Sequence, residues 1–363
     1  MTPAARADPA GGTGLDVTAN TGAVRLDELA AWAAVPAARW PAVLVVDLRA
    51  ARRTGGEVAA VEAALRAAPC PVVGVHGTWE HDPVTEAFAR AATCTLAAED
   101  GADVPPAWVV PVPDPDAAAH ELCTSVGANP RAAAVAAQVL TTSASLPARE
   151  GLLVESWAYA TLQSGAEHRR WLGSRSRTRR GPGAPGEVRL ERDGDVLRVT
   201  LDRPERRNAL DAAARQALHD ALDVARVDPG VRVVLTGAGP SFCSGGDLDE
   251  FGSVTSPSEG HRIRVAAGPA FAMAAVAARV RAEVHGSVVG AGLELAAFAD
   301  HVVATPDATF RLPELAMGLI PGAGGTVSVA RRVGRWRTAW LILTGASVGA
   351  PTARRWGMVD EVR

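Results

Sequence analysis

The segment that most limits the possible folds of this chain is VHGSVVGAGLELAAFADHVVA, from Val284 to Ala304. An apolar strand, a turn of small residues, an apolar helix and a second apolar strand follow one another in it. This order favours a parallel α/β sheet with a right-handed crossover. The segment nevertheless carries a carboxylate, Glu294, within its apolar part. A buried, unpaired carboxylate is costly or shifts its pKa, so Glu294 is a candidate functional residue.

The domain organisation follows from length and from one break in composition. The 363 residues are 48% hydrophobic, which is enough for a sizeable core and for about two domains. The stretch Gly173 to Glu187 lacks apolar periodicity and mixes Gly, Pro, Ser and Arg, which predicts a linker whose arginines belong to a solvated tether. We expect a leader without fixed structure over 1–19, one domain over 20–180, a linker centred on 181–186 and a second domain over 187–363.

Charge and cysteine content exclude several classes of partner. The net charge of -3 indicates neither nucleic acid nor another highly charged polymer. No stretch of about 18 uncharged apolar residues predicts a membrane span. The four cysteines have neither metal-site nor disulfide spacing, and they are Cys70, Cys94, Cys123 and Cys243. They are predicted to be small buried residues, and the protein is predicted to be cytoplasmic, with no bound metal.

Further elements are predicted on both sides of the linker. After it, EVRLERDGDVLRVTLD predicts a hairpin that turns at Asp193-Gly194, and Asp211 is predicted to cap the following helix. Before it, AVLVVDLR and CPVVGVHG predict strands that alternate with helices. The order V-H-G, helix with Ala-Phe-Ala, apolar strand occurs near 75–98 and again near 284–304. This echo indicates either a degenerate internal repeat or a chance similarity in an Ala-rich chain.

Two Gly-rich turns and a second acid complete the candidate site. SFCSGGDLDEF, from Ser241 to Phe251, and GAGLE, from Gly290 to Glu294, are each predicted to join a strand to a helix. Unpaired backbone N–H groups point outward from such turns, and glycine lets a ligand approach the backbone closely. Glu314, in LPEL, is predicted to open a helix. Taken alone, Glu314 could also be an acid that only complements a helix dipole.

Five motifs occur in a fixed order in the second half of the chain. They are Asn208-Ala209-Leu210, FCSGGDL, HGSVVGAGLELA, LPELAMGLIPGAGGT and LTGASVGAPTARRWGMVDEV. In this combination, residues 187–363 resemble the enoyl-CoA hydratase/isomerase, or crotonase, superfamily. The resemblance implies an α/β fold with a crotonase-like ββα spiral in the C-terminal half. It also implies activity on acyl-CoA thioesters, no cofactor beyond the CoA of the substrate, and a homo-oligomer, either a trimer or a hexamer.

The resemblance also assigns roles to residues. The backbone N–H groups of Gly246 and Ala291 correspond to an oxyanion hole, which would stabilise an enolate. Glu294 and Glu314 correspond to the two hydratase acids, which can hold a water and exchange protons with it. The implied substrate-binding residues are Arg206, Arg207, Ser244, Gly245, Asp247, Leu248, Gly290, Pro321 and Gly322. The two arginines are predicted to contact CoA phosphates, although each could also belong to a solvated loop.

The chain departs from the family pattern at its end. It stops at Arg363, before the helices with which the family covers its active site. The first half, however, contains similar helices from about Asn129 to Trp171. We expect 20–180 to be a degenerate, shortened crotonase-like domain whose helices cover the site, from the same chain or a neighbouring one; an unrelated helical prefix is the alternative. The expected docking face consists of Leu152, Leu153, Trp157 and Ala160.

Retention of both glutamates favours an enoyl-CoA hydratase. An isomerase commonly needs only one acid, and thioesterase, decarboxylase and cofactor-free oxygenase reactions can use the same oxyanion hole. From a different class, the chain could be a non-catalytic partner with a decayed site.

Overall fold

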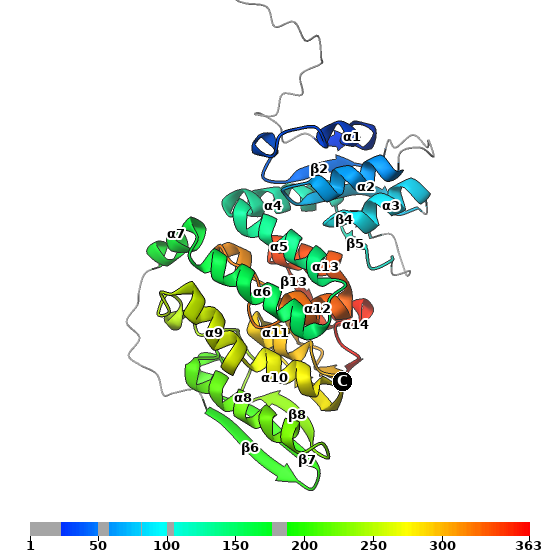
Figure 1. The fold of residues 1–363 in the computed structure, drawn as a ribbon. Helices are drawn as coiled ribbons and strands as arrows, with labels where there is room; N and C mark the ends of the chain where they lie inside the picture. Colours follow the sequence, from blue (N-terminus) through cyan, green and yellow to red (C-terminus); the bar gives the residue numbers. More distant parts are fainter. Residues whose placement is uncertain (1–22, 50–57, 81, 100–104, 176–186) are drawn as a thin grey trace, which may run out of the picture.

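The computed structural model describes residues 23–49, 58–80, 82–99, 105–175 and 187–363 (Figure 1). The predicted leader over 1–19 and the predicted linker over 181–186 lie outside the described residues. The predicted α/β class is confirmed, because three sheets, two of them mostly or wholly parallel, alternate with helices in the described part of the chain. None of the described helices combines the length and the apolar character that crossing a membrane requires.

The first half contains a five-stranded, wholly parallel sheet in the order β1-β2-β3-β4-β5. The strands are β1 Val24–Arg25, β2 Leu44–Asp47, β3 Val72–Thr78, β4 Cys94–Ala98 and β5 Val109–Val112. Helices α1 Leu29–Trp32, α2 Val58–Ala67 and α3 Pro83–Ala91 pack beside one another and cover one face. Successive side chains of a strand point to opposite faces of the sheet, and the two faces belong to two separate cores. Val72 packs under these helices, and Val73 packs into the main core of the molecule.

Four helices follow this sheet. They are α4 Pro115–Ala128, α5 Pro130–Ser143, α6 Ala148–Gln163 and α7 Ala166–Ser174. Asp114 caps α4 by accepting hydrogen bonds from the N–H groups of Asp116 and Ala117, both at 3.0 Å. Because α7 extends to Ser174, the predicted linker start at Gly173 is wrong by two residues, and the linker end at Glu187 is the first residue of a strand.

The second half has a six-stranded sheet in the order β14-β11-β9-β8-β7-β6 and a three-stranded sheet in the order β10-β12-β13. The strands are β6 Glu187–Asp193, β7 Val196–Asp202, β8 Arg232–Gly237, β9 Val280–Val284, β10 Ser287–Val289, β11 His301–Ala304, β12 Thr309–Arg311, β13 Ser347–Gly349 and β14 Glu361–Val362. The predicted hairpin is confirmed as the antiparallel pair β6–β7. Strands β7, β8, β9, β11 and β14 pair in parallel.

Seven helices accompany these sheets in the described part of the second half. They are α8 Ala212–Val227, α9 Pro257–Ala267, α10 Pro269–Val276, α11 Ala291–Ala296, α12 Gly325–Val333, α13 Arg335–Thr344 and α14 Ala350–Trp356. The predicted cap of α8 is confirmed, since the Asp211 carboxylate accepts a hydrogen bond from the Ala214 N–H at 2.8 Å. The four cysteines are free thiols; Cys70, Cys94 and Cys243 are buried as predicted, and Cys123 is only half-buried.

The internal echo seen in the sequence has a structural counterpart. In the first half, β3 leads through α3 to its parallel neighbour β4, and Val73 lies opposite Cys94. In the second half, β9 leads through β10 and α11 to its parallel neighbour β11, and Ala282 lies opposite Val302. The common local topology is what a degenerate repeat would produce; a shared origin of the two halves stays a prediction.

The helices of the first half dock onto the second half within one chain. Helices α12 and α13 pack against α5, α12 also packs against α6, and α13 packs against α4 (Figure 1). A single cluster of buried apolar side chains runs from Val73 through Leu152 to Val359, across both halves. The helices of the first half therefore cover the second half of the same chain.

One part of the predicted docking face is wrong. Trp157 is 55% exposed, whereas Leu152 and Ala160 are buried and Leu153 is half-buried. The buried face of α6 instead includes two polar residues, Glu155 and Ser156, because both have hydrogen-bond partners in the second half. Helical periodicity alone could not have selected polar residues as the buried ones.

We expect residues 187–363 expressed alone to be insoluble or inactive, because their apolar surface under α5 and α6 would be open to water. Co-expression with residues 20–180 should restore soluble protein, which size-exclusion chromatography of the two separately tagged fragments can measure. The full chain is the positive control. A soluble and fully active 187–363 fragment would show that docking is dispensable.

Candidate active site

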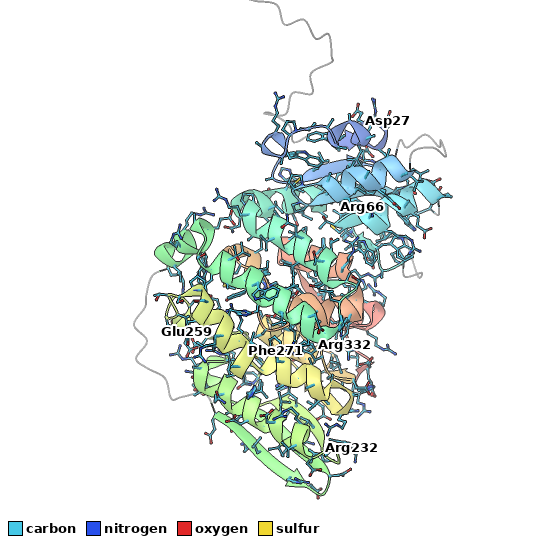
Figure 2. The ribbon with its side chains drawn as sticks, in the orientation of Figure 1. Asp27, Arg66, Arg232, Glu259, Phe271 and Arg332 are labelled. Atoms are coloured by element: carbon cyan, nitrogen blue, oxygen red, sulfur yellow. The ribbon has the colours of Figure 1, made fainter. Side chains whose placement is uncertain are left out.

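A cavity of about 430 Å³ lies at the junction of the two halves. Second-half walls come from the two Gly-rich turns, the segment around Glu314, and α9. The first half closes the cavity with Tyr159 and Gln163 from α6 and Trp171 from α7. In Figure 2, Glu259 is labelled on α9 and Phe271 on α10, the two helices of the second half that pack against α6. A mostly apolar concave site with a few polar groups is the usual form of a small-molecule site.

The two Gly-rich turns are joined by backbone hydrogen bonds. The Cys243 N–H donates to Ser287 O at 3.1 Å, and the Val289 N–H donates to Cys243 O at 2.9 Å. Gly245 has a φ of 99°, a conformation that strongly favours glycine, and a Cβ there would lie 3.7 Å from the Ala291 nitrogen. The two turns are therefore in direct contact at the cavity wall.

This contact presents two free donors to the cavity. Gly246 and Ala291 both line it, and no described hydrogen bond engages the backbone N–H of either residue. Ala291 is the first residue of α11, where a helix leaves its N–H groups without internal partners. Two fixed N–H groups of this kind can stabilise an oxygen that gains negative charge. The first turn continues into a 3₁₀ turn, Leu248–Glu250, rather than into the predicted helix.

Glu294 is buried and held by the N-terminus of α12. Its Oε2 accepts hydrogen bonds from the N–H groups of Ala323 at 2.7 Å and Gly325 at 2.8 Å. Burial raises the pKa of the Glu294 carboxyl well above its ordinary value, and the neighbouring Glu314 raises it further. The carboxyl is thus fixed in position and has an increased affinity for a proton.

Glu314 is the second buried acid of the cavity. Its Oε2 has no hydrogen-bond partner in the described structure, so this oxygen is available to a substrate or water. Burial raises the pKa of Glu314 to about 8. A Cβ on Gly290, whose φ is 52°, would lie 2.7 Å from Glu314 Oε1, so glycine is needed for the acid to approach the turn. Glu314 begins a short 3₁₀ turn, Glu314–Met317, and not the predicted helix.

A third buried acid, Glu155 of α6, was not predicted as part of the site. It accepts hydrogen bonds from Gly324 N–H at 2.7 Å, Thr326 N–H at 2.9 Å and Thr326 Oγ1 at 2.7 Å. Burial raises the pKa of Glu155 to about 7. Like Glu294, Glu155 is an acid within an apolar helix, and this pattern was the only sign of it in the sequence. The hydrogen-bond partners of Glu155 lie in the other half of the sequence.

The predicted substrate-binding residues divide into two groups. Those that line the cavity are Ser244, Gly245, Asp247, Leu248, Gly290 and Gly322. The Asp247 carboxylate is taken up by an ion pair with Arg203 at 2.7 Å, so it holds the turn in place. Arg206, Arg207 and Pro321 are not in the cavity wall. Arg206 forms an ion pair with Asp249 at 3.1 Å, and Arg207 is exposed.

Several cavity residues were missed from the sequence. They are Tyr159, Gln163, Trp171, Arg215 and Arg264. Three of these come from the first half, where no motif marks them. The described residues contain no group of three or more His, Cys, Asp or Glu side chains arranged to hold a metal ion.

The buried acids should make stability depend on pH. Because the pKa of Glu314 is raised from 4.5 to about 8 on folding, the unfolded chain ionises first, and the free energy of unfolding should fall from about pH 5 to about pH 8. Glu314→Gln removes this contribution, so its unfolding free energy should fall less steeply over the same range. Urea unfolding at several pH values measures both slopes; equal slopes in the wild type and the variant would contradict the assigned burial effect.

Known proteins resemble this chain in its second half. The sequence profile of the enoyl-CoA hydratase/isomerase family matches residues 191–363. The 2,3-dehydroadipyl-CoA hydratase of Escherichia coli (strain K12) is 37% identical over 185 residues, covering 48% of this chain and 69% of that protein. The carnitinyl-CoA dehydratase of Salmonella arizonae is 36% identical over 182 residues, covering 48% and 67%. The solved structure of an enoyl-CoA hydratase from Mycobacterium smegmatis is 36% identical, covers 48% and 69%, and has a TM-score of 0.44.

These matches fall on the same segment as the five motifs, and it is this segment that carries both Gly-rich turns, Glu294 and Glu314. The two relatives are each matched over at least two thirds of their length at more than 30% identity. The chain therefore belongs to the enoyl-CoA hydratase/isomerase family.

Proposed function

We propose that this protein is an enoyl-CoA hydratase, which adds water across the double bond of a 2-enoyl-CoA thioester or catalyses the reverse elimination. The observation that carries the proposal is the presence of two buried acids, Glu294 and Glu314, in the same cavity as two free backbone N–H groups. The names of the two relatives, a hydratase and a dehydratase, are consistent with this reaction.

The two backbone donors have the role of polarising the thioester. In the proposed complex the thioester oxygen accepts hydrogen bonds from the N–H groups of Gly246 and Ala291. When the oxygen of the attacking water adds to Cβ, electron density moves through Cα to the thioester oxygen and forms an enolate. Fixed donors stabilise that charge without reorganisation, and loss of one such donor typically costs about 2.7–4 kcal/mol of barrier.

The two acids divide the proton transfers. We assign Glu294 the role of base that takes a proton from the attacking water, because two N–H hydrogen bonds fix its Oε2 at the cavity wall. The raised pKa of its carboxyl makes the ionised form a stronger proton acceptor. The water oxygen forms its bond to Cβ. Glu314, whose raised pKa keeps it protonated near neutral pH, delivers its proton to Cα. The product has gained one H and one OH, and a proton exchange between the acids through the next water restores the starting state.

Binding of CoA requires no further cofactor in this proposal. The exposed Arg207 is the better candidate for a CoA phosphate, because Arg206 already pairs with Asp249. We propose a cytoplasmic location, which the four free cysteines support.

We expect Glu294→Gln and Glu314→Gln each to reduce turnover by at least about a hundredfold, because each removes one proton-transfer group. Their thermal stability should be unchanged or higher, since a buried ionisable group is lost. The assay follows loss of the enoyl-CoA absorbance across short, medium and aromatic substrates. Full activity in Glu314→Gln would indicate a reaction that needs one acid, such as isomerisation, and acyl-CoA binding without turnover in the wild type would indicate a non-catalytic partner.

We further propose that the protein is a homo-oligomer, a trimer or a hexamer. Large apolar side chains outside the cavity remain exposed on the single chain, including Val227 at 74% and Leu190 at 47%, and their burial against another copy would favour association. Multi-angle light scattering at micromolar concentration should give a multiple of the chain mass of 37.4 kDa. A single species with the mass of one chain would contradict this proposal.

A further inference from the structure

We propose that the acyl group of the substrate ends in a carboxylate and that Arg264 binds it. The inference rests on the proposed function in one respect, that the 430 Å³ cavity receives the acyl group. Arg264 lies on α9 and lines both this cavity and a smaller adjoining one of about 80 Å³. It is therefore a half-buried cation in a largely apolar site.

The bonds of Arg264 leave part of its guanidinium unused. Nε donates to Ser156 Oγ at 3.0 Å, and one terminal nitrogen donates to the Ser156 carbonyl at 3.1 Å. The guanidinium carbon lies 4.6 Å from the centre of the Tyr159 ring. No described acceptor engages the other terminal nitrogen, and Arg264 forms no ion pair with a described carboxylate. The two hydrogen bonds to Ser156 position the guanidinium of Arg264. The remaining N–H groups of the guanidinium are open to a ligand.

The second arginine of the cavity shows that this arrangement is specific to Arg264. Arg215 also lines both cavities, but it is neutralised by Glu250 at 2.9 Å and donates to the Leu210 carbonyl at 3.0 Å. A cation removed from water is costly unless it is paired. Of these two arginines, only Arg264 has no ion pair with a described carboxylate; the charge of the buried Glu155 acts on it from beyond ion-pair distance.

One neutral donor accompanies Arg264. The hydroxyl of Tyr159, a cavity-lining residue of α6, takes part in no described hydrogen bond. Gln163 presents an acceptor instead, since a Cβ on Gly260 would lie 3.1 Å from its Oε1 and 3.5 Å from the free terminal nitrogen of Arg264, and this Oε1 is buried without a described partner. A carboxylate can accept from a guanidinium and a hydroxyl together.

The position of Tyr159 relates this subsite to the catalytic acids. One side of the ring lies under Arg264, and the ring edge lies against Gly322, where a Cβ would be 2.4 Å from it. The next residue, Ala323, donates its N–H to Glu294. Tyr159 thus contacts both Arg264 and the loop that binds Glu294. Both residues line the same cavity, so an acyl chain whose reacting carbons lie at the acids can end at Arg264 within it.

The experiment compares acyl-CoAs with and without a terminal carboxylate. Isothermal titration calorimetry on the full chain would use saturated, unbranched acyl-CoAs of about four to eight carbons, each paired with the neutral acyl-CoA of equal length. We expect the best carboxylate ligand to bind at least about tenfold more tightly than its neutral partner, because a site built to bond a polar group rejects the analogue without it. Arg264→Met should remove this preference and leave the neutral ligand's affinity unchanged or higher.

Three variants separate recognition from folding. Ser156→Ala removes the hydrogen bond from Arg264 to Ser156 Oγ but keeps the positive charge of Arg264, so the preference for the carboxylate ligand should persist. Tyr159→Phe removes one donor and should reduce the preference several-fold. Arg262→Met is the matched control, because Arg262 is an exposed residue of the same helix that pairs with Glu259 at 2.6 Å, and Glu259 is labelled on the outer side of α9 in Figure 2. It should bind both ligands as the wild type does.

Several outcomes would overturn the inference. A wild-type protein that binds both members of every pair equally, or an Arg264→Met variant that keeps the preference, would show that Arg264 has only a structural role. If Arg264→Met fails to fold, the wild-type preference and its reduction in Tyr159→Phe decide the question. A clear binding preference without hydration of any enoyl-CoA would refute the proposed hydratase reaction and leave the carboxylate subsite standing.

Discussion

The site and the docking of the two halves both depend on the N-terminus of α12. Four consecutive N–H groups there, from Ala323 to Thr326, alternate between two carboxylates. Glu294 of the second half takes the first and third, and Glu155 of the first half takes the second and fourth. A helix N-terminus leaves its first N–H groups without internal partners and favours negative charge. Each carboxylate thus satisfies donors that would otherwise be buried and unpaired.

Burial at this junction raises the pKa values of the three acids, whereas the N–H groups of α12 lower those of Glu155 and Glu294. Glu155, Glu294 and Glu314 are all buried, and the charge of Glu155 raises the pKa of both of the others. Glu155 itself is fully bonded to α12, so it influences the proton affinity of the candidate catalytic acids without facing the reaction. The first half therefore supplies part of the wall of the cavity and also part of its electrostatics.

Local patterns predicted most of the fold and much of the candidate site. Period-two and helical patterns located β2, β3, α5 and α8, and glycine content located the two Gly-rich turns, because these features depend on neighbouring residues. Within the turns, the family resemblance assigned Gly246 and Ala291. Glu155 and Arg264 were missed, since their roles arise from partners more than a hundred residues away. Trp157 was wrongly placed in the interface for a related reason. Apolar character favours burial on average, but here the bonds of Ser156 and Glu155 determine which face of α6 turns inward.

The order of the halves along the chain has a consequence for synthesis. Helices α5 and α6 leave the ribosome well before α12 and α13, the helices that cover their apolar faces, since the Glu155 hydrogen bonds span 169 and 171 residues. Contacts of such long sequence separation form late, because the entropy of closing the loop must be overcome first. Until then, the apolar faces of α5 and α6 are not covered by the second half, and the Glu155 carboxylate lacks the N–H groups of Gly324 and Thr326. Docking of the two halves can be completed only after residues 323–326 have been synthesised, when their N–H groups become available to Glu155.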